Sequence, residues 1–305
     1  MKMNCFGKQN GAVLILMFVG LFMAGATVVL TALNNRNPQL RENARVQAAM
    51  QEAKQALLAY AVMYNNEFVG SGPGRLPCPD KNNSGELEEG VDCAGAAFGR
   101  LPQRHTLPFG ALVEFGNLYA GIDQQFWYAV SANYRHPVVP TSPLNSSTPG
   151  TLTLDGDEVV AVIIAPGQAL GTQSRIPANV NSSVHYLDSA NSGGTNFVSL
   201  DAISPETFND RLLPIRRREL MTLVTARVAQ EIKRVLDPAD PYPDVATFET
   251  AMAAAGGWYI TDGWDARVIY TQDSPRAQVQ FTDCNIVYVL TPGDPDLQRT
   301  NSTSC

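Results

Sequence analysis

The sequence has few of the residues on which catalysis depends. Only three of its 305 residues are histidine, and none of them stands with Ser or Cys in an arrangement typical of nucleophilic catalysis. The G-x-S-x-G and H-E-x-x-H motifs are missing, and no Gly-rich loop between a strand and a helix is present to bind phosphate. These absences lead us to expect a protein that is not an enzyme.

Basic residues are also scarce. Lys and Arg together number 22 against 29 Asp and Glu, which gives a formal net charge of -7. Because nucleic-acid binding needs clustered Lys and Arg to neutralise phosphates, we expect no nucleic-acid partner. The one basic cluster, Arg216–Arg217–Arg218, stands where a helix is predicted to begin, and a solvated helix face accounts for it.

Charge is wholly lacking in the stretch Ala12–Leu33. As a helix with a rise of about 1.5 Å per residue this stretch is about 33 Å long, enough to cross a hydrocarbon core of about 30 Å. A cleaved secretory signal has a shorter apolar region, and a lipoprotein signal has its cysteine after the run, whereas Cys5 precedes it. Lys2 and Lys8 fit a plain signal anchor that leaves the downstream chain outside the cytoplasm.

The same leader supports another interpretation. A short basic leader, then Gly11, then an uncharged apolar helix resembles the type IV prepilin signal, in which a membrane peptidase cuts after the glycine and the new N-terminal residue is methylated. The resemblance implies cleavage between Gly11 and Ala12. Most pilins have Glu at the fifth mature position, where this chain has Leu16. The chain is therefore most similar to the Glu-less minority, the tip pseudopilin of type II secretion (the K subunit) and the X-type minor pilins.

Three later stretches extend the resemblance. Gln55–Tyr60, Leu76–Asp80 and Phe126–Val130 look like segments of a group of large prepilin-like proteins of Gram-negative bacteria. The resemblance implies a pseudopilin-type subunit with four parts: a leader over residues 1–11, a transmembrane helix over 12–33, an amphipathic continuation over 34–66 and a periplasmic domain over 67–305.

The spacing of apolar residues predicts a helix over Gln39–Tyr64. Its apolar stripe steps by three or four residues, as one face of a helix requires, and consists of Val46, Met50, Ala53, Leu57, Ala61 and Tyr64. A break near Asn37–Pro38 is expected to separate it from the membrane helix, because proline disfavours helix in the residue before it.

The remaining chain alternates strand and helix signals. Strands are predicted at Gln125–Ser131, Thr151–Asp155, Glu158–Ala165, Asn196–Leu200, Ala266–Thr271, Ala277–Thr282 and Asn285–Thr291. Asp155–Gly156 is a hairpin signal, and the unbroken apolar run Val159–Ile164 predicts a central strand. Helices are expected at Ser204–Glu206, Arg217–Leu236 and Asp244–Ala255, with a long loop over Pro166–Thr195. The fold class predicted is α+β: a long N-terminal helix, membrane-spanning and then amphipathic, followed by a domain with an antiparallel sheet and packed helices.

Four cysteines remain if Cys5 is removed with the leader. An even number in an oxidising compartment predicts disulfides, and four cysteines allow three connectivities. We favour the sequence-local pairs, Cys78 with Cys93 and Cys284 with Cys305, each stabilising the fold by about 3 kcal/mol. A zinc site is the alternative, but the sequence has no C-x-x-C pair.

One turn has the composition of a calcium loop. Asp80, Asn82, Ser84 and Glu86 alternate with other residues around Gly85, as in the first half of an EF-hand loop. The Glu expected at the twelfth position is replaced by Val91, so an Asx-rich turn without an ion is the alternative. No other cofactor is predicted.

The other polar and aromatic candidates have structural explanations. His105, His136 and His185 are expected to be surface residues, and a polar hairpin tip accounts for Asp155, Asp157 and Glu158 without catalytic roles. Trp258, Tyr259 and Trp264 lie among glycines and are expected to be core residues at a sheet edge, rather than a binding surface.

These observations together predict a minor pseudopilin or pilin-like subunit of a type II secretion or type IV pilus system. It would cross the bacterial inner membrane once, with its main domain in the periplasm, and assemble with other pilins or pseudopilins through the N-terminal helix after cleavage by the prepilin peptidase. Leu16 favours a position at the filament tip. The alternative function is a signal-anchored periplasmic domain that binds a ligand and never joins a filament.

Overall fold

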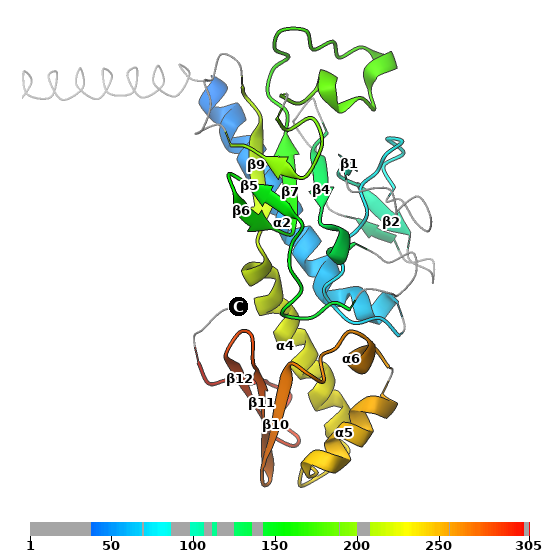
Figure 1. The fold of residues 1–305 in the computed structure, drawn as a ribbon, viewed down its shortest axis with the longest axis vertical. Helices are drawn as coiled ribbons and strands as arrows, with labels where there is room; N and C mark the ends of the chain where they lie inside the picture. The colour runs from blue at the N-terminus through cyan, green and yellow to red at the C-terminus, as the bar shows by residue number, and fades with distance from the viewer. Residues whose placement is uncertain are drawn as a thin grey trace, which may run out of the picture. The chain divides into compact units, whose positions relative to one another are not determined.

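The computed structural model describes residues 38–68, 70–86, 98–106, 112–114, 125–135, 143–188, 190–199, 208–255, 257–301 and 305. The chain divides into two compact units, 1–47 and 48–305, and the contacts discussed below all lie within the second. The fold is α+β, with antiparallel sheets and a few helices (Figure 1), which confirms the α+β part of the predicted class.

The helices and strands have the following bounds. The helices are α2 (Pro38–Glu67), α4 (Arg217–Leu236), α5 (Val245–Ala254) and α6 (Trp258–Thr261), with 3-10 turns η1 (Ala132–Tyr134), η2 (Pro177–Asn179) and η3 (Ser183–His185). The strands are β1 (Phe98–Arg100), β2 (Arg104–Thr106), β3 (Leu112–Glu114), β4 (Trp127–Val130), β5 (Leu152–Leu154), β6 (Asp157–Val159), β7 (Ala161–Ala165), β8 (Asn196–Phe197), β9 (Arg211–Ile215), β10 (Val268–Asp273), β11 (Arg276–Phe281), β12 (Ile286–Leu290) and β13 (Gln298–Arg299).

Helix α2 buries the predicted apolar stripe except at its first residue, Val46, which is only partly buried. The stripe residues from Met50 to Tyr64 are at most 1 % exposed, whereas Glu52, Gln55 and Ala59 on the other side are exposed. Burial of a Leu or Met side chain contributes about 1.5–3 kcal/mol, so packing of this face stabilises the helix more than local propensity does. Lys54 marks where the helix meets its neighbours: its ammonium donates to the Pro214 carbonyl of β9 at 2.9 Å and pairs with Glu219 of α4 at 2.6 Å.

The main sheet has the strand order β1-β4-β7-β9, all antiparallel. Strand β7 lies between β4 and β9, and every one of its residues is buried, as the unbroken apolar run predicts. Its side chains Val162 and Ile164 belong to a core cluster with Trp127, Leu154, Leu187 and Phe197. The predicted strand at Gln125–Ser131 is β4, shorter at both ends.

The prediction of a single strand over Glu158–Ala165 is wrong, because this stretch forms two strands, β6 and β7. β6 pairs with β5 in a separate sheet, of order β6-β5-β8, and β7 pairs in the main sheet. The change of sheet falls at Val160, whose N–H donates to the Ile215 carbonyl and whose carbonyl accepts from Ser131. The hairpin before it is confirmed: Asp155 and Gly156 both have positive φ, 53° and 88°, as a type I′ turn requires.

Helix α4 has the predicted bounds, and its stripe Leu220, Val224, Val228 and Ile232 is fully buried. Strand β9, directly before α4, is absent from the prediction. Pro214 lies within it, and a proline is tolerated there because β9 is an edge strand of the main sheet.

The last part of the chain is a meander, β10-β11-β12-β13, accompanied by α5 and α6 (Figure 1). Its first three strands match the predicted ones within two residues. Asp244 is the N-cap of α5, and its carboxylate accepts from the Thr247 N–H at 2.9 Å. Phe248 of α5 stacks on Tyr270 of β10 with ring centroids 4.1 Å apart, which fixes the helix on the sheet.

Some predicted segments cannot be compared with the structure. The segment 12–33 with Gly11 and Ala12, the helix at Ser204–Glu206, and Leu200 lie outside the described residues. Within the part of the chain that the structure describes, no helix is both long and apolar enough to cross a membrane. The predicted loop Pro166–Thr195 is confirmed, with η2 and η3 as its only regular turns among the residues described there.

Candidate functional site

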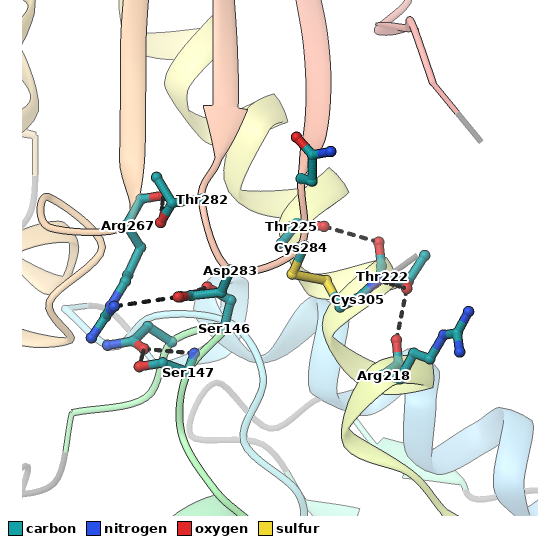
Figure 2. Close-up of a disulfide and its surroundings, with 12 residues drawn as sticks. Ser146, Ser147, Arg218, Thr222, Thr225, Arg267, Thr282, Asp283, Cys284 and Cys305 are labelled. Carbon is teal, nitrogen blue, oxygen red and sulfur yellow. Dashed lines mark hydrogen bonds and ion pairs between the residues drawn. A yellow bond between two sulfur atoms is a disulfide. The ribbon is translucent and has the colours of Figure 1, made fainter. Parts of the chain in front are cut away.

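The C-terminus is tied to the rest of the chain by the predicted disulfide between Cys284 and Cys305. Cys284 lies in the turn between β11 and β12, and its Cα is 4.1 Å from that of Cys305. The Cys305 N–H donates to the Thr222 hydroxyl of α4 at 3.2 Å, and that hydroxyl donates to the Arg218 carbonyl at 2.7 Å (Figure 2). The disulfide therefore joins three elements: the β11–β12 turn, the chain terminus and α4.

The residue before Cys284 makes a second connection. The Asp283 carboxylate pairs with Arg267 at 3.3 Å and accepts from the Ser146 hydroxyl at 2.8 Å, from the loop that precedes β5 (Figure 2). The β11–β12 turn thus contacts the 143–150 loop as well as α4.

A buried ion pair makes the third connection, and we refer to Arg75 and Asp262 as the central pair. Arg75 lies after the glycine-rich stretch that follows α2, Asp262 follows α6, and the Arg75 Nη2 and Asp262 Oδ1 atoms are 3.4 Å apart. The Asp262 carboxylate also accepts from the N–H groups of Gly72 and Leu144, each at 3.2 Å. Burial raises the pKa of Asp262, and Arg75 opposes this; burial likewise lowers the pKa of Arg75. Because desolvation is the leading cause in both cases, the pair depends on its partners to remain charged.

Cys78 lies close to Arg75 in sequence. It is fully buried, and its sulfur is in a disulfide; its predicted partner Cys93 lies outside the described residues. The Leu76 N–H donates to the Tyr134 carbonyl at 2.7 Å, which holds this proline-rich stretch against η1.

The predicted calcium loop is a compact turn. The Asp80 carboxylate, almost fully buried, accepts from the N–H groups of Ser84 and Gly85 at 3.2 and 2.7 Å. Asn82 Oδ1 accepts from the Ser84 N–H at 2.8 Å, and Glu86 pairs with Arg104. Among the described residues, no group of three or more His, Cys, Asp or Glu side chains is placed to hold a metal ion. Calcium binding here stays a prediction.

A pair of buried carboxyls was missed by sequence reasoning. Asp188 lies in the irregular segment after η3, and Asp210 directly precedes β9; they are 5 % and 0 % exposed. The Asp188 N–H donates to Asp210 Oδ2 at 2.8 Å, and the Asp210 N–H donates to Asp188 Oδ2 at 3.1 Å. Each carboxyl thus accepts from the backbone of the other, and the sequence signal was two acids in polar loops, which alone indicates surface residues.

The residues considered as catalytic alternatives have ordinary partners. Asp157 pairs with Arg216 at 3.0 Å and Glu158 with Arg217 at 3.4 Å, so the acidic hairpin tip and the basic cluster neutralise each other. Asp155 accepts from the Ser199 N–H at 2.8 Å.

The histidine and aromatic candidates from the sequence also have structural roles where the structure describes them. His185 Nδ1 accepts from the Ser174 N–H at 3.2 Å, while His136 and the side chain of His105 lie outside the described residues. The three aromatic candidates are buried, as predicted for core residues: Trp258, Tyr259 and Trp264.

Comparison with known proteins returned no match. No protein-family model matches the chain, and neither a curated protein nor a solved structure matches it. A functional assignment therefore rests on the residues of this chain.

Proposed function

We propose that the protein is a minor pseudopilin-like subunit of a type II secretion or type IV pilus system, held in the bacterial inner membrane with its main domain in the periplasm. The observation that carries the proposal is the uncharged stretch Ala12–Leu33 directly after Gly11 and a basic leader. Such a stretch is long enough to cross a membrane once. A prepilin peptidase cleaves the chain directly after a glycine at this position.

The described part of the chain supports the proposal in one way. An amphipathic helix, α2, follows the apolar stretch and buries one face, with its Lys54 bonded to the antiparallel main sheet. This is the arrangement that an N-terminal helix carrying a globular domain requires. The partners are the inner membrane, the prepilin peptidase and other pilin-like subunits, which contact the apolar helix.

The residue at position 16 refines the proposal to a tip subunit. A carboxylate at this position would neutralise the N-terminal amine of a neighbouring subunit, and an unpaired charge in an apolar filament core is costly. Leu16 has no charge to offer the chain ahead of it. At the tip no chain lies ahead whose amine would be left unpaired, so the energetic cost of lacking the carboxylate is smallest there. The Ala12 amine of the tip subunit can itself pair with a glutamate carboxylate of the subunit behind it.

Processing is tested by the N-terminal sequence and intact mass of the protein from cells with and without the prepilin peptidase. The mature protein is expected to begin at Ala12, and Gly11→Ile is expected to block cleavage. Gly7→Ala, in the leader but away from the cut, is the matched control and should be processed normally. A chain that begins at Met1 in both strains would rule out the pseudopilin and leave the signal-anchored ligand-binding domain.

The tip position is tested by immunogold labelling of sheared filaments with quantitative mass spectrometry. We expect label at filament ends and a copy number far below that of the major subunit. Label along the whole length at near-equal stoichiometry would contradict a tip role, and Leu16→Glu, which restores the carboxylate, is expected to spread the label along the filament.

A further inference from the structure

The segment 167–199 is fastened to the main sheet by Asp188, Asn191 and Asp210, which we call the acid clamp. Besides the reciprocal bonds between the two acids, the Asn209 N–H donates to Asp188 Oδ2 at 2.6 Å. The side-chain amide of Asn191 donates to Asp210 Oδ2 at 3.3 Å and accepts from the Val198 N–H at 3.0 Å. The clamp therefore connects the second half of the segment to the residues directly before β9.

The two oxygens of Asp210 have different surroundings. Oδ2 accepts from the Asp188 N–H and from Asn191, whereas Oδ1 is buried and no described residue donates to it with good hydrogen-bond geometry; the backbone of Gly167 is the one further group near the carboxyl that favours its charged form. A buried carboxylate oxygen without a donor is costly, but a protonated oxygen is a donor and carries no charge. The neighbouring residue Asn209 has a buried side-chain oxygen that also lacks a partner, so an acceptor is available close by in the chain.

Burial and the charge of Asp188 both favour the protonated form of Asp210. Burial, followed by other contributions that include the like charge of Asp188, raises the pKa of the Asp210 carboxyl to about 7, although hydrogen bonds from Asp188, Asn191 and Gly167 oppose this. Two further titratable side chains belong to this neighbourhood: the Arg175 guanidinium, which interacts with both acids, and Tyr186, which interacts with Arg175. Two carboxylates in one buried site repel, and a single positive charge cannot neutralise both.

We propose that Asp210 is a proton-operated latch, which holds the segment 167–199 against the main sheet when protonated and loosens it when ionised. The step is the transfer of the Asp210 proton to water, which leaves a carboxylate beside that of Asp188. Because the folded-state pKa lies above the ordinary 3.8, the stabilisation is complete below about pH 4 and is lost as the pH rises through about 7. A shift of about three pKa units corresponds to a change of up to about a thousandfold in the open population.

Release has a structural consequence, because the segment covers part of the core. Tyr186, Leu187 and Phe197 pack with Trp127 of β4, and the Arg100 guanidinium lies over the rings of both Trp127 and Tyr186, 4.0 and 4.3 Å from their centroids. A loosened segment uncovers these aromatic residues, whereas α4 and the C-terminal sheet, which lack clamp residues, keep their protection.

The test is hydrogen exchange of the full-length protein in detergent at pH 5 and pH 8.5, with rates corrected for intrinsic exchange. In the wild type, protection of peptides from 167–199 should fall by at least tenfold at pH 8.5, while peptides from α4 stay unchanged. Asp210→Asn carries a neutral donor in place of the hydroxyl, so its protection should be the same at both pH values. Asp157→Asn, in an exposed ion pair on another hairpin, is the matched control and should behave as the wild type.

A second measurement covers the case in which Asp210→Asn does not fold. Isotope-edited infrared spectroscopy of wild-type protein with labelled Asp should show the carbonyl band of a buried protonated carboxyl at pH 5 and its loss as the pH rises through about 7. A wild-type protein with no protonated Asp at pH 5.5, or equal pH dependence in the wild type and Asp210→Asn, would overturn the latch.

Discussion

Asp262→Ala is expected to lower the free energy of unfolding by about 3–5 kcal/mol, the usual result of breaking a buried ion pair from one side. The carboxylate accepts from Arg75 and from the N–H groups of Gly72 and Leu144. Its removal leaves Arg75, a residue that is only 4 % exposed, without its counter-charge. Two backbone donors are left unpaired as well, and each costs about 1–3 kcal/mol if water cannot reach it.

The same reasoning predicts a smaller effect when both charges are removed. Burial is the leading cause of the pKa shifts of both Arg75 and Asp262, so part of their mutual attraction only offsets desolvation. Arg75→Met combined with Asp262→Ala should therefore cost less than the sum of the single changes.

The assay is chemical denaturation followed by tryptophan fluorescence for the wild type, the two single variants and the double variant. Asp157→Ala is the matched control, because its pair with Arg216 is exposed and should contribute less than about 1 kcal/mol. If Asp262→Ala is as stable as Asp157→Ala, or if the two central-pair changes simply add, the reasoning is refuted.

Three further outcomes are expected in the same assay. Leu57→Ala, which empties a fully buried position of α2, should cost about 2–5 kcal/mol, whereas Gln55→Ala on the exposed side should stay within about 0.5 kcal/mol of the wild type. Asp244→Ala removes the N-cap of α5 and should cost about 1 kcal/mol. Replacing Cys284 and Cys305 together by Ser should cost about 3 kcal/mol, and no change upon adding reductant to the wild type would contradict a stabilising disulfide.

Elements with a regular apolar period could be predicted from the sequence. The stripe of α4, from Leu220 to Ile232, and that of α2 repeat every three or four residues, and this period alone identifies the buried face. The hairpin at Asp155–Gly156 was predictable for a different reason, since few residue pairs adopt positive φ at both positions. Cys284 and Cys305 were paired correctly because the separation between them is short.

Other elements have no such local signal. Strand β9 contains Pro214, which argues against a strand unless the strand is known to lie at an edge, and that knowledge comes only from the sheet. Helix α6 has four residues, too few to show a helical period. The run Val159–Ile164 is apolar throughout, so nothing in it reveals a change of sheet at Val160.

The buried polar pairs of the candidate site could not be predicted, because the two members of each pair are far apart in the sequence. Arg75 and Asp262 are 187 positions apart, and Asp188 and Asp210 are 22 positions apart in segments that are polar and irregular. Charged residues in such segments are usually exposed. Only the tertiary structure shows that all four are buried and that each faces its own partner.

The change of sheet at Val160 limits how the chain can vary in length. Because β6 and β7 follow each other with one residue between them, an inserted residue there would turn every side chain of β7 to the opposite face and place its register out of step with β4 and β9. The Asp155–Gly156 turn, only a few residues earlier and exposed, can lengthen without moving either sheet. Natural or designed insertions should therefore accumulate at that turn and be absent from Val160.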